Sequence, residues 1–530
     1  MSTWSMIGLV ALFLVLFASL RLPLLALPVL VAGFLGGTAS CLLLFGTVHG
    51  LTLAFGSALI GVSVDYAVHF HCHQVFAPHP DGPRHTLRSI WNGLLLGAGT
   101  TVVGFVALVV SSFPGLRELA VFAAAGITAA LVATWVFLPG LAARGGRPTA
   151  ASRWVVARLQ AAISPRPGRR WLLLVPAVVV ALLAATGLPR LGWDDGLANL
   201  NRLDPALQAE DQSVRDRVVR YEQRRLVVAV GADEEQALQA NDRVEQALAV
   251  AERTGALAGH RGIAPMLPSA ARQTAVAAAV RGTPELWPHL VDALRAEGFK
   301  PAAFEPFHAA LATAPPPPLT YADLAATSLV SMVRPFRIAL DDGVAFATFV
   351  HGVHDEAAVR AALAAIPGAA MIDVEGTLSA AYGAYRERML ELCLLGLGAV
   401  GFLVWLRHRR VVPTAIAFVP AALAAAGTAG LLALCGVDLN MLSLVALLMV
   451  VSMGVDYGVF LAETMADAEA LAATYLAVFV AGVTTMLGFG LLAISEQPAL
   501  RGIGLTSGIG VLLCLVLAPT LCAFVARRSR

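Results

Sequence analysis

The sequence predicts an α-helical polytopic membrane protein with about 11 transmembrane helices, two five-helix repeats and one inserted extracytoplasmic α/β domain. Three observations predict this fold class. Of 530 residues, 58% are hydrophobic and 14% are charged, whereas soluble domains carry roughly 25% charged residues. One long hydrophilic stretch interrupts the apolar runs, and a short motif with a single acid occurs once on each side of it.

Apolar runs near the ~20 residues that a helical span requires recur along the chain. The first is the shortest, and no basic residue precedes it and no small-residue cleavage site follows it, so we interpret it as a retained span. The predicted spans are 6–20, 23–45, 51–70, 90–110, 119–141, 171–188, 389–406, 411–434, 439–462, 471–494 and 502–525.

The arginines predict the orientation, because short cytoplasmic loops carry an excess of Lys and Arg. The opposite short loops hold only Arg117 and Arg501. We therefore expect a periplasmic N-terminus and a cytoplasmic C-terminus, with the mildly amphipathic segment 154–163 along the inner surface. The arginines on the predicted cytoplasmic side are Arg21, Arg84, Arg88, Arg144, Arg147, Arg153, Arg158, Arg166, Arg169, Arg170, Arg407, Arg409, Arg410, Arg527, Arg528 and Arg530.

The hydrophilic region from 190 to about 387 falls on the outer side and is predicted to be a mixed α/β domain. Its β-branched and alternating runs predict strands at 225–230, 344–350 and 370–374. Its helical periodicity predicts helices at 234–252 and 356–365. The middle, 268–313, is also expected to be helical and precedes a stiff proline run at 315–318. A helix from 382 is expected to continue into the next span.

An internal repeat determines the predicted architecture. Asp65-Tyr66 matches Asp456-Tyr457, and Thr100-Thr101 before Gly104-Phe105 matches Thr484-Thr485 before Gly488-Phe489 at a nearly constant offset. Both copies enter the membrane from the same side, so the repeats have the same orientation. The predicted domains are a first transmembrane repeat at 1–145, a cytoplasmic interfacial linker at 146–170, an entry helix at 171–189, the inserted domain at 190–387 and a second repeat at 388–530.

Two carboxylates at membrane depth are the strongest functional feature. A charged Asp near the bilayer centre costs at least ~2.5 kcal/mol, and such groups usually serve ion or proton movement. The alternative is a neutral, hydrogen-bonded packing role. A tyrosine follows each acid, so in a two-fold arrangement each phenol could donate to the Asp of the other copy. The sequence thus predicts a proton relay of Asp65, Tyr66, Asp456 and Tyr457.

Paired threonines lie near the acids in the repeat. Thr100, Thr101, Thr484 and Thr485 are candidates for relay support along a polar path. The alternative is that each hydroxyl donates to a carbonyl of the preceding helical turn, which is common for threonine in apolar helices.

Three histidines surround Cys72 at the end of the third predicted span. His69 and His73 share a helix face, which permits a metal site, but interfacial histidines without a matching cluster elsewhere are usually only hydrated. No metal is therefore expected. No phosphate loop, nucleophile elbow or zinc-protease motif occurs, so the sequence predicts neither an enzyme nor a nucleic-acid-binding protein.

The paired motifs at 61–66 and 452–457, the repeated helices and the inserted domain resemble the resistance-nodulation-division (RND) superfamily, in particular its MMPL (mycobacterial membrane protein large) family. The resemblance covers almost the whole chain, and the doubled Asp-Tyr is its most specific part. It implies a ferredoxin-like porter domain and a proton relay at the two Asp-Tyr pairs. It also implies export of lipid or other hydrophobic cargo from the bacterial inner membrane, driven by the proton gradient without a bound cofactor.

The chain departs from this family, whose members have twelve spans and two porter domains. It lacks the first span and the first domain, so the expectation is that upstream coding or a companion polypeptide supplies them, unless the gene is a non-functional remnant. The expected partners are membrane lipids, the hydrophobic or lipid-linked substrate and this polypeptide. An alternative function is a protein-translocation accessory or a sterol-sensing-like membrane module, which shares the helix arrangement without exporting a small molecule.

Overall fold

The computed structural model describes residues 2–18, 21–50, 52–53, 63–111, 113–142, 148–164, 169–195, 205–218 and 225–526. Contacts divide the chain into a helical unit, Met1–Arg202 with Ala381–Arg530, and an inserted unit, Leu203–Ala380. Several predictions fall outside the described residues. These are half of the span 51–70 (51 and 54–62, with Gly61 among them) and the arginines Arg144, Arg147, Arg166, Arg527, Arg528 and Arg530.

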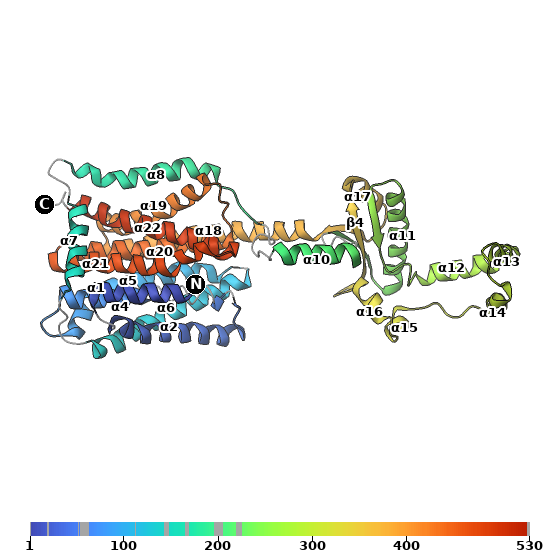
Figure 1. Cartoon of the computed structure of the whole chain (residues 1–530), viewed down its shortest axis with the longest axis horizontal. Coiled ribbons are helices and arrows are strands. Elements are labelled where there is room, and N and C mark those ends of the chain that lie inside the picture. Colours follow the sequence, from blue (N-terminus) through green and yellow to red (C-terminus); the bar gives the residue numbers. More distant parts are fainter. Residues whose placement is uncertain are drawn as a thin grey trace. The chain divides into compact units, whose positions relative to one another are not determined.

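The helical unit consists of long apolar helices that lie side by side (Figure 1). Short 3-10 segments extend two of them: Arg170–Leu174 and Leu188–Arg190 flank α8, and Gly490–Ile494 follows α21. The helices are α1 (Ser2–Phe17), α2 (Arg21–Phe45), α4 (Val64–Phe76), α5 (Pro83–Val109), α6 (Pro114–Leu141), α7 (Ala150–Ala162), α8 (Val175–Gly187), α18 (Val374–His408), α19 (Val411–Leu434), α20 (Met441–Thr464), α21 (Ala468–Gly488) and α22 (Pro498–Ala526).

Nine helices within the described part of the chain are long and apolar enough to cross a membrane. The predicted count of about eleven is not reached for two reasons. The first predicted span corresponds to α1, whose 16 residues reach only roughly 24 Å, less than the ~30 Å hydrocarbon core. Of the third predicted span, only 52–53 and the end from Ser63 onward, which forms α4, are described.

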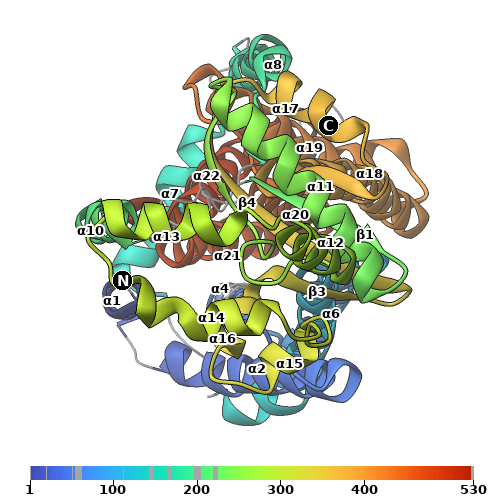
Figure 2. The same ribbon diagram turned by 90° about the vertical axis from the view of Figure 1, so that its right-hand side faces the viewer.

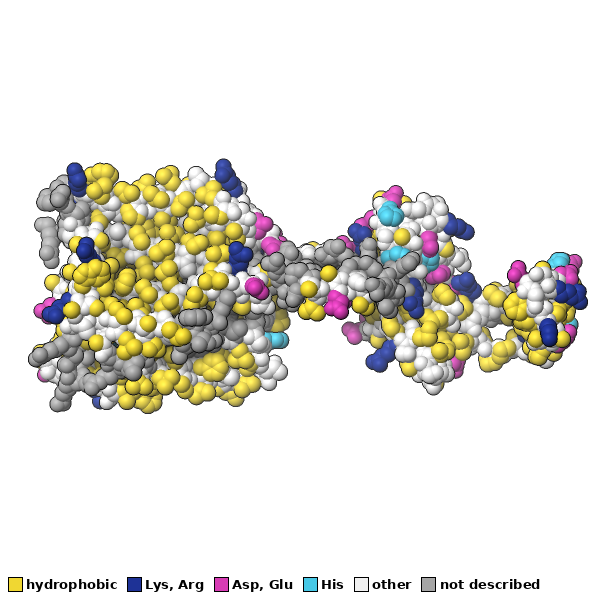
Figure 3. All heavy atoms as spheres, viewed as in Figure 1, with side chains coloured by type: hydrophobic (Ala, Val, Ile, Leu, Met, Phe, Trp, Pro, Cys, Tyr) yellow, Lys and Arg dark blue, Asp and Glu magenta, His cyan; other side chains and the backbone are white. Residues whose placement is uncertain are grey.

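The flank of the helical unit is apolar, as a lipid-facing surface requires. On the face drawn in Figure 3, hydrophobic side chains cover this flank and charged side chains gather at its two ends. Large side chains such as Leu43, Val110 and Val411 are 85%, 73% and 77% exposed, and an apolar surface of this extent indicates contact with a membrane. The chain is therefore a polytopic membrane protein.

Helices from the two halves of the unit pack in a reciprocal pattern. In the first half α2 contacts α4 and α6, and in the second half α19 contacts α20 and α22. Across the halves, α4 packs against α21 and α20 packs against α5. Each motif helix therefore contacts the threonine-bearing helix of the other half.

The inserted unit is built on an antiparallel sheet in the order β2-β4-β1-β5, with β3 paired to β4. The strands are β1 (Arg225–Gly231), β2 (Leu257–Arg261), β3 (Arg337–Leu340), β4 (Gly343–Val353) and β5 (Ala369–Asp373). The helices are α10 (Pro205–Val218), α11 (Glu234–Arg253), α12 (Ala270–Arg281), α13 (Leu286–Ala296), α14 (Glu305–Leu311), α15 (Tyr321–Ala325), α16 (Val330–Val333) and α17 (Glu356–Ala364).

The core of the inserted unit forms between the sheet and two helices. α11 lies along the sheet (Figure 2). Val227 of β1, Val244 and Leu248 of α11, and Val359 and Leu363 of α17 are almost completely buried together. Asp233 accepts a hydrogen bond from the Gln236 N–H and so caps α11, which fixes the start of this helix.

The predicted strands at 225–230, 344–350 and 370–374 and the helices at 234–252 and 356–365 are confirmed. The predicted helical middle is confirmed as α12, α13 and α14. The amphipathic segment 154–163 lies in α7 except for its last residue, Ile163, which is the C-cap. The sequence prediction missed β2 and β3, which are only 5 and 4 residues long. Such short strands show little alternation, and three of the four β3 residues are exposed. α18 begins at Val374, before the predicted start at 382.

His260 on β2 lies between two carboxylates. Its Nε2 is 3.2 Å from Glu245 Oε1 and its Nδ1 is 2.9 Å from Glu252 Oε2, and its side chain is 8% exposed. Only the doubly protonated imidazolium can donate from both ring nitrogens. The hydrogen bond with Glu245 is the main reason why the pKa of His260 is raised above its usual value, and it outweighs the opposing effect of burial.

We expect the stability from this arrangement to depend on pH. The pKa of His260 is higher in the folded than in the unfolded state. Its contribution to the free energy of unfolding is therefore complete below the unfolded pKa of about 6.5 and is lost as pH rises through the folded pKa. His260→Gln should therefore lower the unfolding temperature of the full chain in detergent more at about pH 5.5 than at about pH 9. His289→Gln, on the exposed face of α13, is the control. An equal effect of His260→Gln at both pH values would contradict the prediction.

Candidate functional site

Asp456 lies in the middle of α20 and is partly buried. Its carboxylate faces α5, where the Thr100 hydroxyl oxygen is 3.3 Å from Asp456 Oδ1 and 2.7 Å from the carbonyl oxygen of Gly97. A hydroxyl has one proton to donate and lone pairs to accept. Thr100 can therefore donate to a charged Asp456, or donate to Gly97 while accepting from a protonated Asp456. The contact suits both protonation states.

Gly97 provides the space for this carboxylate. A Cβ at position 97 would lie 2.8 Å from Asp456 Oδ1 and 3.0 Å from its Cγ, closer than real Cβ contacts. Only glycine lets α5 approach the acid without displacing it. The sequence prediction did not identify Gly97, because the glycine matters only through a helix packed against it. The sequence signal that could have identified Gly97 is its position three residues before Thr100, on the same face of the helix.

Asp65 is the second acid. It lies in the first turn of α4 as described, is 8% exposed, and is close enough to Asp456 for the two carboxylates to interact electrostatically. Thr484 of α21 lies beside Asp65, but its hydroxyl donates to the Ala481 carbonyl at 2.8 Å. Oδ1 of Asp65 has no hydrogen-bond partner among the described residues. The structure thus brings the two predicted acids together.

The tyrosines are buried beside the acids, but the predicted crossed hydrogen bonds are not both formed. Tyr66 is 7% exposed and interacts electrostatically with both carboxylates. Tyr457 is 1% exposed and interacts electrostatically with Asp65 and Asp456. Within the described part of the chain, its hydroxyl oxygen has no hydrogen-bond partner. The hydrogen bond from Tyr457 to Asp65 that the two-fold arrangement permits is therefore not formed in this conformation.

The predicted supporting threonines divide into two groups. Thr101 donates to the Gly97 carbonyl at 3.1 Å and Thr484 donates to Ala481, which is the structural alternative for threonine in a helix. Thr100 makes the same kind of bond but also contacts Asp456, and Thr485 lies beside Tyr457. All four side chains are buried around the acids.

The three histidines around Cys72 contact three different helices and do not converge. His69 stacks on Phe460 of α20 with ring centroids 3.8 Å apart, and His73 Nε2 is 3.2 Å from Thr474 Oγ1 of α21. His71 packs edge-on against Phe17 of α1. The expectation that they are hydrated interfacial side chains is wrong, because His69 and His73 are each 2% exposed and pack between helices.

An apolar pocket of about 290 Å³ lies between α18, α19 and α20. Alanines of α19 form one wall and leucines of α18 and α20 form the others, and Trp193 and Leu439 also line it. Its volume and apolar lining are suited to a hydrocarbon chain.

The segment 191–195 is bound directly to the turn that precedes α20. The Leu439 N–H donates to the Gly192 carbonyl at 3.1 Å, and the Asp194 N–H donates to the Leu439 carbonyl at 2.9 Å. Asp195 forms an ion pair with Arg386 of α18 at 3.0 Å, and the Arg386 guanidinium lies over the Trp193 ring. This network ties the chain leaving α8 to the helix that carries Asp456.

No family model matches the chain. It is similar to a protein of Streptomyces coelicolor that is described as a membrane protein, with 27% identity over 216 residues. The match covers 35% of this chain, and the chain spans only 30% of the length of this curated relative. The similarity and the apolar helices together support a membrane location for this chain.

Proposed function

We propose that this chain is a proton-driven exporter of the RND type, similar to the MMPL family. The observation that carries the proposal is the pair of acids, Asp65 and Asp456, on helices that pack across the two halves of the bundle. Ionisable residues within apolar helices are rare and mark ion or proton pathways.

The relay would work because it costs too much free energy for both carboxylates to be ionised at the same time. Two carboxylates in a low-dielectric interior repel each other, so a proton on one lowers the cost of a charge on the other. Thr100 would stabilise Asp456 in either state, and the tyrosines would keep bulk water from the pair. Each proton that crosses supplies ~2.3 kcal/mol per 100 mV of membrane potential.

The proposed architecture follows from the reciprocal packing. α4 and α5 with their neighbours would form one five-helix repeat, and α20 and α21 with theirs would form the second. The strand order of the inserted unit is that of a ferredoxin-like, split β-α-β topology, which supports a porter domain. We place the protein in the bacterial inner membrane with a periplasmic N-terminus, a cytoplasmic C-terminus and a periplasmic inserted domain.

The cargo would be a lipid or another hydrophobic molecule, and the pocket between α18, α19 and α20 supports this class. The pocket lies beside Leu439, whose backbone binds the segment 191–195. Movement of α20 would therefore reach both the pocket and the chain that leads toward the inserted unit.

Reconstitution in liposomes tests the function directly. An imposed proton gradient should drive proton uptake and movement of a fluorescent phospholipid, and a protonophore should stop both. Lipid movement that is indifferent to the gradient would contradict the proposal. Photo-crosslinking from the inserted unit in cells distinguishes the two candidate functions. Adducts with lipids support an exporter, and adducts with nascent secreted chains support a translocation accessory.

Filling the pocket should reduce lipid binding. Ala425→Trp places an indole in the pocket, so crosslinking of a photoactivatable lipid should fall about tenfold, which corresponds to ~1.4 kcal/mol. Val419→Trp adds the same ring on α19 at a side chain that is 47% exposed, and labelling should be unchanged. Equal labelling of the two variants would exclude this pocket as the lipid site.

A further inference from the structure

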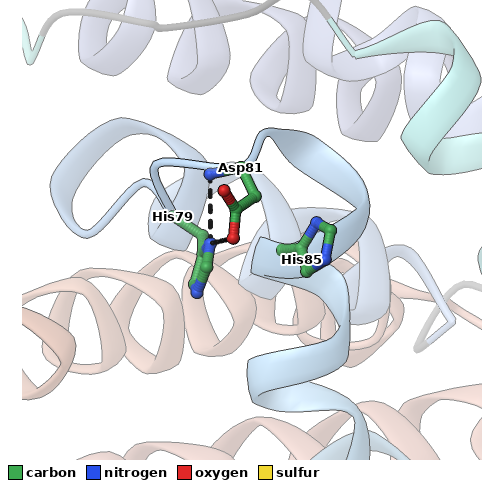
Figure 4. Close-up of side chains that lie close together, drawn as sticks. All are labelled: His79, Asp81 and His85. Carbon is green, nitrogen blue, oxygen red and sulfur yellow. Dashed lines mark hydrogen bonds and ion pairs between the residues drawn. The ribbon is translucent and has the colours of Figure 1, made fainter.

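The turn between α4 and α5 brings together three potential metal ligands that the proposed transport function does not use. His79 and Asp81 lie in the turn, and His85 lies in the first helical turn of α5 (Figure 4). One ligand atom from each side chain lies within 4.8 Å of the other two. His79 Nδ1 is 3.5 Å from Asp81 Oδ2.

The backbone of the turn holds these side chains in place. The Gly82 N–H donates to the His79 carbonyl at 3.0 Å, and the His79 N–H donates to Thr86 Oγ1 at 3.0 Å. Gly82 has a φ of 101°, which favours glycine, and Pro83 begins α5 with a fixed φ. The ligands are therefore held near one another before an ion binds, which lowers the cost of binding.

We propose that His79, Asp81 and His85 bind a divalent transition metal of the Zn²⁺ type. In zinc sites the imidazole and carboxylate ligands lie about 2.0 to 2.2 Å from the ion. Tetrahedral geometry then separates two ligands by about 3.4 Å, close to the 3.5 Å between His79 and Asp81. Two imidazoles and one carboxylate suit Zn²⁺, Ni²⁺ or Cu²⁺, whereas Mg²⁺ and Ca²⁺ prefer oxygen ligands.

The hydrogen bonds of the His79 and His85 rings leave nitrogen atoms that can bind a metal ion. Nδ1 of His85 is buried and has no hydrogen-bond partner among the described residues. Nδ1 of His79 accepts only a 3.2 Å hydrogen bond from the Asp81 N–H. The two rings stack with centroids 5.3 Å apart, so a small rotation of the side chains closes the ligand set. Water would complete a fourth coordination position.

A bound ion would join the turn after α4 to the first turn of α5. α4 carries Asp65, and α5 carries Gly97 and Thr100. The ion would thus restrain the connection between two helices of the acidic site, and by binding the folded state it should raise the unfolding temperature.

Metal titration of the full chain, purified without a histidine tag, tests the site. We expect one Zn²⁺ per chain, a Co²⁺ absorption spectrum typical of nitrogen and oxygen ligands, and no competition from excess Mg²⁺. His79→Ala, Asp81→Asn and His85→Ala should each weaken Zn²⁺ binding at least about tenfold, as loss of groups around a metal commonly does. His354→Ala removes an exposed histidine of the inserted unit and should leave binding unchanged.

The unfolding temperature of each variant, measured without metal, shows whether weaker Zn²⁺ binding comes from loss of a ligand or from misfolding. Asp81→Asn removes the carboxylate with almost no change in side-chain shape. Zn²⁺ binding that survives the double variant His79→Ala, His85→Ala would overturn the proposal, as would displacement of the ion by Mg²⁺. Zn²⁺ binding and its competition by Mg²⁺ are both measured without transport. The proposed metal site can therefore be disproved while the proposed export function stands, and the reverse.

Discussion

Asp456→Asn is expected to abolish proton-coupled transport while the protein still inserts in the membrane. Asparagine has nearly the same shape and can bond with Thr100, but it cannot bind and release a proton. Loss of a group that transfers protons typically costs 10² to 10⁴ in rate, so transport should fall at least about 100-fold. Proton flux and lipid movement in liposomes, measured together, give this result.

Glu463→Gln is the matched control on the same helix. Glu463 lies in the last turn of α20 and pairs with Arg407 at 3.2 Å, away from the acidic pair. Its loss removes a partly exposed ion pair, which is worth little, so transport should remain. Asp65→Asn should resemble Asp456→Asn, because the relay requires both acids. Full transport by either Asp variant would refute the relay.

Gly97→Ala is expected to have the second largest effect. The new Cβ would stand 2.8 Å from Asp456 Oδ1, so α5 or the carboxylate must move and the 3.3 Å contact with Thr100 would be disturbed. Overpacking of this kind costs about 1 to 3 kcal/mol, and a misplaced reacting group can cost as much as about 100-fold in rate. We expect correct insertion, a lower unfolding temperature and strongly reduced proton flux.

Gly99→Ala separates this effect from the general consequence of replacing glycine in a helix. Among the described residues, a Cβ at position 99 meets only Leu403 Cδ2, at 3.8 Å, which is an ordinary contact. Alanine favours a helix over glycine by about 1 kcal/mol, so this variant should be at least as stable as the natural chain and transport normally. Equal loss of transport in both variants would show that α5 needs flexible glycines rather than space for Asp456.

Much of the fold could be predicted because its causes are local. The long apolar runs, such as Val411–Leu434, directly reflect the length and composition that a bilayer requires. The strand at Arg225–Gly231 and the helix at Glu234–Arg253 have clear periodicities. β3 was not predicted because it has only four residues, which pair with β4. α1 begins at Ser2, before the predicted span 6–20, because an apolar run does not fix where a helix begins.

The amino-acid pattern alone predicts that the chain crosses a membrane, that one motif occurs twice and that each copy places an acid in an apolar helix. These properties depend on residues that are neighbours along the chain. The three-dimensional packing was needed to show that α20 packs on α5 and α4 on α21, that Gly97 leaves room for Asp456, and that the hydroxyl of Tyr457 has no hydrogen-bond partner among the described residues. It also brought His79, Asp81 and His85 together. Such contacts depend on which helix faces approach each other and on the direction of each side chain, and local periodicity contains neither.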